Sequence, residues 1–149
     1  MINVIDKYQE FQKCNDGQKM ELLDEFRTIA LNETDPTEWV KLFLQIAQTD
    51  SSPCVKHESA FNTGQVFAKH KSFEKRENIR EEAARAFCEI VENDESLVVK
   101  HETMEAMGDA DFNTPEVRAL LYKYSQYKNY AMANTARISY WQITGEEIF

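Results

Sequence analysis

The sequence predicts an all-α fold, an α-solenoid of about four helix pairs, on three observations. Eight stretches carry apolar side chains at helical spacing, and short polar turns with cap residues separate them. Valine and isoleucine do not alternate with polar residues over a useful length, and the chain has only four glycines and three prolines. Such a composition disfavours strands joined by tight turns. Finally, one segment of the chain recurs 44 residues later.

The helices are placed by their caps and apolar stripes. Ser52-Pro53 and Thr114-Pro115 are the strongest start signals, because serine or threonine caps a helix and proline fits its first turn. We expect helices at about 4–13, 18–31, 36–48, from Pro53 past Gly64, at 78–92, from Ser96 to Asp109, and at 115–127 and 130–144.

We expect one domain over residues 1–149, because a chain of this length matches the usual size of a single domain. Capping helices occupy 1–31, the repeats lie at about 36–110, and a C-terminal helix pair covers 114–144. The first and last helices are expected to close the stack as caps.

The recurring segments span residues 50–64 and 94–108. A period of this size is typical of the two-helix repeats of the HEAT/armadillo class. Gly64 lies inside a helix, where glycine is unfavourable, so we expect a close approach of a neighbouring helix there. Seven pairs of positions are identical: Asp50/Asp94, Ser52/Ser96, Val55/Val99, Lys56/Lys100, His57/His101, Glu58/Glu102 and Gly64/Gly108.

Two His-Glu pairs are the part of this repeat that carries chemistry. Neighbouring residues of a helix point about 100° apart, so a histidine and the glutamate after it cannot easily hold one metal together. If the two helices lie side by side, His57 and His101 can bind one metal. Glu58 and Glu102 can then reach a second metal, a bridging position or the substrate. Two histidines and a carboxylate with open positions suit a non-haem iron that activates O₂. The alternative is that the pairs serve only packing or the helix surface.

Charge and composition limit the partners. The 26 acidic and 17 basic residues give a net charge of −9, which argues against nucleic acid as a partner. This charge attracts a cationic substrate or a basic protein, or it simply keeps the protein soluble. We see no signal peptide and no apolar run of membrane-spanning length, so we expect a cytoplasmic protein that does not enter a membrane.

The remaining reactive or aromatic side chains carry weaker signals. Cys54 and Cys88 are expected in the core, with all three cysteines reduced, and His70 is expected in an exposed loop. The C-terminal aromatic residues are expected to serve packing, with the wall of a cleft as the alternative. They are Tyr122, Tyr124, Tyr127, Tyr130, Tyr140 and Trp141.

At the two His-Glu motifs the chain resembles deoxyhypusine hydroxylase, a HEAT-like repeat di-iron mono-oxygenase. The repeats of that family read like Val-(Lys/Arg)-His-Glu-x-Ala-x-x-Leu-Gly. Here the counterparts are Val55-Lys-His-Glu-Ser-Ala-Phe-Asn-Thr-Gly64 and Val99-Lys-His-Glu-Thr-Met-Glu-Ala-Met-Gly108. The resemblance covers roughly residues 36–143 and is loose outside the motifs.

The resemblance implies a di-iron centre that binds O₂ and hydroxylates a modified lysine on a basic protein. His57 and His101 would be iron ligands, and Glu58 and Glu102 would be ligands or catalytic carboxylates close by. Family members have two similar halves and four motifs, whereas this chain has one half and two motifs. The resemblance therefore implies a half-length relative whose active site is shared across a homodimer.

Two other functions remain open on the sequence. A metal-free HEAT-repeat adaptor would bind a partner protein on the concave face of the stack. A HEAT-repeat protein of the chromophore-lyase type is the third reading, and no motif of this chain favours it.

Overall fold

Eight α-helices and one short 3-10 helix make up the computed structural model, which describes residues 3–148. The helices are α1 (Val4–Gln12), α2 (Asp16–Asn32), α3 (Thr37–Thr49), α4 (Pro53–Lys69), η1 (Lys71–Phe73), α5 (Glu77–Asn93), α6 (Leu97–Asp109), α7 (Pro115–Ser125) and α8 (Tyr130–Thr144). No strand occurs among the described residues. The all-α prediction and the order of the helices are therefore confirmed. Within the same range, no helix is both long and apolar enough to cross a membrane.

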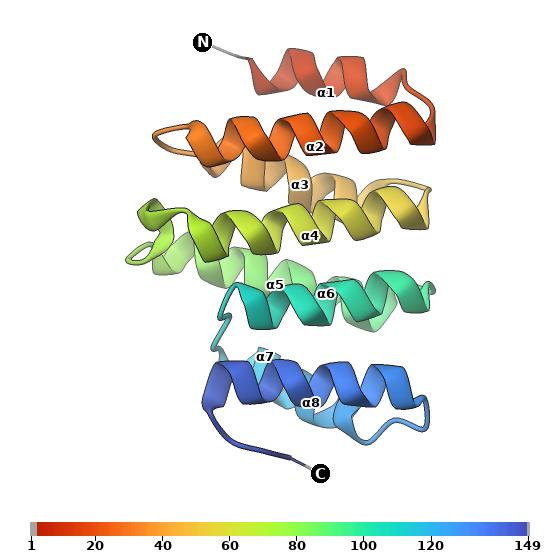
Figure 1. The fold of residues 1–149 in the computed structure, drawn as a ribbon, viewed down its shortest axis with the longest axis vertical. Coiled ribbons are helices and arrows are strands. Elements are labelled where there is room, and N and C mark those ends of the chain that lie inside the picture. The colour runs from red at the N-terminus through yellow and green to blue at the C-terminus, as the bar shows by residue number, and fades with distance from the viewer. Residues whose placement is uncertain (1–2, 149) are drawn as a thin grey trace.

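The helices lie in two layers, which Figure 1 shows one behind the other. The inner row, as we call it, consists of α2, α4, α6 and α8, and each of these helices packs against the next one. A second row of α3, α5 and α7 lies behind it, and α1 lies beside α2 at the N-terminal end. The two His-Glu segments, in α4 and α6, are thereby neighbours in space.

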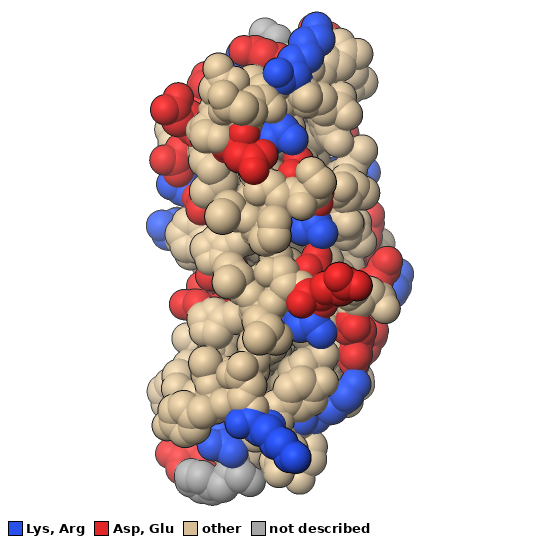
Figure 2. All heavy atoms as spheres, turned by 90° about the vertical axis from the view of Figure 1, so that its right-hand side faces the viewer, with Lys and Arg blue, Asp and Glu red and all other residues tan. Residues whose placement is uncertain are grey.

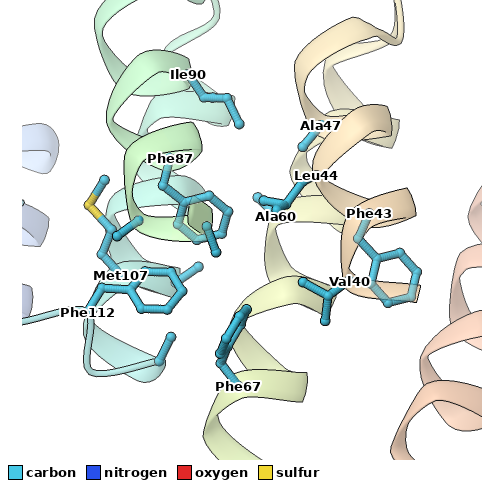
Figure 3. Close-up of a cluster of buried hydrophobic side chains, with 14 of the residues drawn as sticks. Val40, Phe43, Leu44, Ala47, Ala60, Phe67, Phe87, Ile90, Met107 and Phe112 are labelled. Carbon is cyan, nitrogen blue, oxygen red and sulfur yellow. The ribbon is translucent and has the colours of Figure 1, made fainter. Parts of the chain in front are cut away.

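The hydrophobic core lies between the two rows. Phe87 from the second row and Phe67 from α4 point toward Phe112, which follows α6, while the buried Phe43 lies on the other side of α3 (Figure 3). The Phe67 ring lies 5.0 Å from the Phe112 ring, and Phe87 lies 5.5 Å from Phe112, both edge to face. This geometry is favourable for aromatic pairs, so the core fixes the inner row against the second row.

Every helix of the inner row begins with the same kind of cap. Asn15, Ser52, Ser96 and Asn129 each accept a hydrogen bond from the backbone N–H three residues further on. Side-chain caps of this kind satisfy donors that the first turn leaves free. The caps give the four helices a common numbering frame, in which residues of different helices are compared by the number of residues that separate them from the cap.

The inner helices approach one another at the same place in this frame. The residue twelve after the cap of one helix contacts the residue ten after the cap of the next. These contacts are Arg27 to Asn62, Gly64 to Ala106, and Gly108 to Ser139. A Cβ atom on Gly64 would lie 2.9 Å from the Ala106 Cβ atom, which confirms the predicted close approach.

Lysine–aspartate ion pairs join successive inner helices at their N-terminal ends. Lys19 Nζ lies 2.8 Å from Asp50, and Lys56 Nζ lies 2.8 Å from Asp94. Each aspartate also accepts a hydrogen bond from the backbone N–H of the next cap residue. Lys100 has no such aspartate and lies 5.9 Å from the centre of the Tyr124 ring. Acidic and basic side chains are interspersed over this side of the molecule (Figure 2).

Three expectations for single residues need correction. Cys54 is exposed, whereas Cys88 is buried as expected. His70 is half-buried and hydrogen-bonded, because its Nε2 atom lies 2.7 Å from the Glu33 carbonyl oxygen. Of the C-terminal aromatic residues only Tyr124 is buried. Tyr122, Tyr127, Tyr130 and Trp141 are exposed.

Candidate metal centre

A contact between the two His-Glu motifs lies at the centre of the inner row. His57 stands five residues after its cap in α4, and Glu102 stands six residues after its cap in α6. His57 Nε2 lies 3.2 Å from Glu102 Oε2. The close packing of α4 on α6 at Gly64 makes this contact possible, since it brings the two helix axes together. The histidine of the first motif thus meets the glutamate of the second.

Glu102 is the buried member of the cluster. Its side chain is only 9% exposed, and burial raises the pKa of Glu102 from its ordinary value of 4.5 to about 8. The carboxylates of Glu105, Asp109 and Glu58 add to this increase in pKa, because like charges disfavour a further ionisation. A cation placed here would relieve this repulsion.

His101 and Glu105 complete the cluster on the solvent side. His101 Nδ1 lies 3.9 Å from Glu105 Oε2, and both side chains are about half exposed. One ligand atom from each of His101, Glu102 and Glu105 can be chosen so that all three atoms lie within 4.8 Å of one another. This group pairs His101 with the glutamate that follows it, which the geometry of a helix did not lead us to expect. One imidazole and two carboxylates are thus gathered on α6, the His57 imidazole contacts Glu102 from α4, and the side with His101 and Glu105 is open to solvent.

Glu58 lies in different surroundings. Its Oε1 atom is 3.2 Å from Nη1 of Arg27, in α2. The same guanidinium donates to Asn62 at 2.8 Å and to Asp24 at 2.8 Å, and it lies over the Phe61 ring. The charge of Glu58 is thus balanced by an arginine within the chain. Of the four residues predicted as ligands, Glu102 contacts His57 and also lies in one group with His101 and Glu105. No contact joins the two histidines among the described residues, and Glu58 faces Arg27.

Three residues of the site lie outside the motif that the sequence shows. Glu105 and Asp109 follow Glu102 by one and two helical turns, a spacing that places them on the same side of α6. Arg27 gave no signal, because its role depends on α2 packing against α4. Asp109 also has a raised pKa, caused by burial and by the Glu105 carboxylate.

No family model, curated protein or solved structure matches this chain.

Proposed function

We propose that this protein binds iron through His57, His101 and Glu102, and that it is a half-length, deoxyhypusine hydroxylase-like mono-oxygenase. The observation that carries the proposal is the contact of His57 with Glu102 across two helices, 3.2 Å between Nε2 and Oε2. In this reading the two rows of helices are those of a HEAT-like solenoid, and the inner row presents the site.

The residues present fit an iron(II) ion. Two imidazoles and one carboxylate with open positions are the donor set of non-haem iron enzymes. Glu105 can provide a fourth ligand, and the exposure of His101 and Glu105 leaves room for O₂ and a substrate. When bound, the iron would supply the activation of O₂. The protein's own part is to hold the imidazoles and to keep Glu102 in a dry position, while Arg27 keeps Glu58 oriented.

One chain supports one such set of ligands, so we expect one iron per chain and two per homodimer. A di-iron centre shared between two chains is the form that the resemblance implies. It would need the His-Glu faces of the two chains to meet, and it would need Glu58 to leave Arg27. Both forms give one iron per chain, so the oligomeric state of the iron-loaded protein, with and without a chelator, decides between them.

The substrate class follows from the charge around the site. Glu105 and Asp109 are close enough to raise the pKa of Glu102, while Glu58 is balanced by Arg27, and the whole chain carries a charge of −9. A cationic group, such as the amine of a deoxyhypusine-like lysine on a basic protein, is therefore favoured electrostatically. The resemblance points to the same class of substrate.

Iron binding tests the proposal directly. The protein is loaded anaerobically with Fe(II) at pH 8, desalted and analysed for metal. We expect about one iron per chain in the wild type and a loss in the His57→Ala/His101→Ala variant. His70→Ala is the matched control, because His70 is the third histidine and its partners lie outside the cluster. Retention of iron by the double variant, with circular dichroism showing a folded protein, would overturn the assignment.

A metal-free adaptor is the second candidate. It is favoured by the fact that the polar contacts are satisfied internally: His57 pairs with Glu102, and Glu58 pairs with Arg27. The same experiment separates the two functions. An adaptor binds no iron at any pH between 6 and 9, and its His57→Ala variant keeps its thermal midpoint when iron is added, as the wild type does.

A further inference from the structure

The last helix of the inner row has an outward face that no other helix covers. Trp141 stands twelve residues after the cap of α8, the place at which Gly64 and Gly108 contact the next helix. No helix follows α8 among residues 3–148, and the Trp141 side chain is 53% exposed. At the other end of the row, α1 covers α2 (Figure 1).

This face of α8 is apolar and nearly free of charge. Tyr130 is 75% exposed and Ile138 is 50% exposed. Arg137 is the only charged residue in α8, and its Nη2 atom already donates to the Ser125 carbonyl oxygen at 3.0 Å. The exposed residues of α1 are mostly polar, as a terminal helix of a stack requires, whereas those of α8 include two aromatic rings. The face of α8 therefore resembles an internal contact of the row.

We propose that α8 of a second copy packs on this face, antiparallel to the first about a two-fold axis. Lys128 lies just before α8, and Glu146 and Glu147 lie just after it. All three side chains are exposed, and no ion pair engages them within the described residues. In an antiparallel pair, Lys128 of each copy comes next to Glu146 and Glu147 of the other, so the ends of the two helices are complementary.

The charge distribution favours a second copy over an unrelated basic protein. Residues 114–148, which include Glu146 and Glu147, contain four basic and three acidic residues, whereas the whole chain has a charge of −9. In Figure 2 the lower end presents mostly uncharged side chains, with lysine or arginine side chains and a smaller acidic group beside them. This end is therefore the place where two strongly acidic chains can approach with the least repulsion. A basic protein would find no carboxylate on α8 itself.

The size of the contact predicts a weak dimer. Each copy contributes one helix face with two large aromatic side chains. Together the two faces bury on the order of 1,000 Å², which is at the lower end for specific interfaces. We therefore expect dissociation in the micromolar range. Packed helices lie about 8–10 Å apart, so the α6 helices of the two copies would be separated by about three such steps. The two His57–Glu102 clusters would remain separate, and the dimer does not depend on iron.

Sedimentation velocity of the full chain between about 1 and 200 µM tests this interface. The wild type should shift from monomer to dimer, with or without a chelator. Trp141→Glu and Tyr130→Glu should remain monomeric over the whole range. Tyr122→Glu is the matched control, because Tyr122 is equally exposed but lies on α7, and this variant should dimerise like the wild type.

Charge exchange tests the antiparallel orientation. Lys128→Glu alone should weaken the dimer at least tenfold, because it places like charges together at both ends. The triple variant Lys128→Glu/Glu146→Lys/Glu147→Lys should recover the dimer. Failure of the triple variant to recover it would overturn the antiparallel arrangement.

Three further outcomes would overturn the interface. A wild type that stays monomeric at 200 µM would show that this face does not bind a second copy. A dimer that survives Trp141→Glu would lie elsewhere. A dimer that a chelator dissolves and Trp141→Glu does not would point to contact through a shared iron site, and it would leave iron binding itself intact.

Discussion

Glu58 and Glu102 occupy the same position of the motif but lie in different environments. Both follow a histidine in the same frame, six residues after the cap. Glu58 accepts a hydrogen bond from the guanidinium of Arg27, whereas Glu102 is buried, and burial and neighbouring carboxylates raise the pKa of Glu102 to about 8. The sequence could predict that the motifs converge, but it could not separate the two glutamates. The difference comes from residues of neighbouring helices that only the packing brings near.

The raised pKa of Glu102 predicts how the stability of the metal-free protein depends on pH. The folded state holds a proton on Glu102 up to pH 8, whereas an unfolded chain loses it near 4.5. The contribution of Glu102 to the free energy of unfolding is therefore complete below pH 4.5 and is lost as the pH rises through 8. Since one pKa unit corresponds to about 1.4 kcal/mol, the loss is on the order of a few kcal/mol.

Urea unfolding at pH 5, 7 and 9 with a chelator present measures this effect. We expect Glu102→Gln to remove most of the decrease in unfolding free energy between pH 5 and 9. Glu89→Gln, at an exposed position on α5, should keep the wild-type decrease. Equal slopes for all three proteins would show that Glu102 does not control the pH dependence.

Bound iron should reverse this dependence. A metal needs the ionised carboxylate, so binding releases the Glu102 proton and strengthens as the pH rises toward 8. Titration of the anaerobic protein with Fe(II) at pH 6.5 and 8 should give tighter binding at pH 8, and Glu102→Gln should bind weakly at both. Affinity that falls between these two pH values would contradict Glu102 as a ligand.

On the scale of the helices, one contact recurs: the residue twelve after the cap of one inner helix meets the residue ten after the cap of the next. This contact decides which side chains come together. The intervals from cap to cap are 37, 44 and 33 residues, because the lengths of the second-row helices and of the connections differ. The sequence therefore shows a repeat only where two histidines mark it, between α4 and α6. The other two steps keep the same geometry without a fixed period, so they could not be read as repeats.

Gly64→Ala tests the closest of these contacts. The new Cβ atom would lie 2.9 Å from Ala106 Cβ and 3.2 Å from its Cα, and overpacking of this kind costs about 1–3 kcal/mol. Part of the cost is offset by the better helix propensity of alanine, about 1 kcal/mol. We therefore expect a lower free energy of unfolding in urea, with a weaker His57–Glu102 contact.

Gly17→Ala is the control for the same change in propensity. Gly17 lies in the first turn of α2, and a Cβ atom there would meet only the Asn15 side chain, at an ordinary 3.6 Å. This variant should be as stable as the wild type or more so. If Gly64→Ala also stabilises the protein, the α4–α6 distance is not fixed by the glycine.

On the scale of the whole molecule, the ends of the stack differ from its middle. α4 and α6 have a neighbour in the inner row on both sides, whereas the main contacts of α1 are with α2 and α3. Apart from Phe11, the α1 side chains are partly or fully exposed. The layered order of helices could be predicted from caps and apolar stripes. The unequal ends could not, because they depend on which apolar residues find no neighbour.

Native-state hydrogen exchange should follow this difference. Amides in α4 and α6 should exchange only through global unfolding, whereas those of α1 should exchange through local opening. In the proposed dimer, amides of α8 should become slower to exchange as the protein concentration rises, and in Trp141→Glu they should not. Uniform protection across α1, α4 and α6 would mean that the stack opens as a single unit.

The His57–Glu102 contact has a direction along the stack. In this contact the histidine of one motif reaches the next inner helix, and the glutamate of the other motif reaches the previous one. The two motifs of this chain therefore form one histidine–glutamate contact, which we call a junction, and one glutamate and one histidine are left without such a contact. Arg27 pairs with that glutamate, Glu58. His101 meets no carboxylate of α8, because α8 carries Thr135 where α6 carries Glu102 in the frame, and its Nδ1 atom lies 3.9 Å from Glu105 of its own helix. In the proposed iron-binding function, the number of sites would follow the number of these histidine–glutamate contacts and not the number of motifs. Thr135→Glu should therefore create a second junction on the same chain.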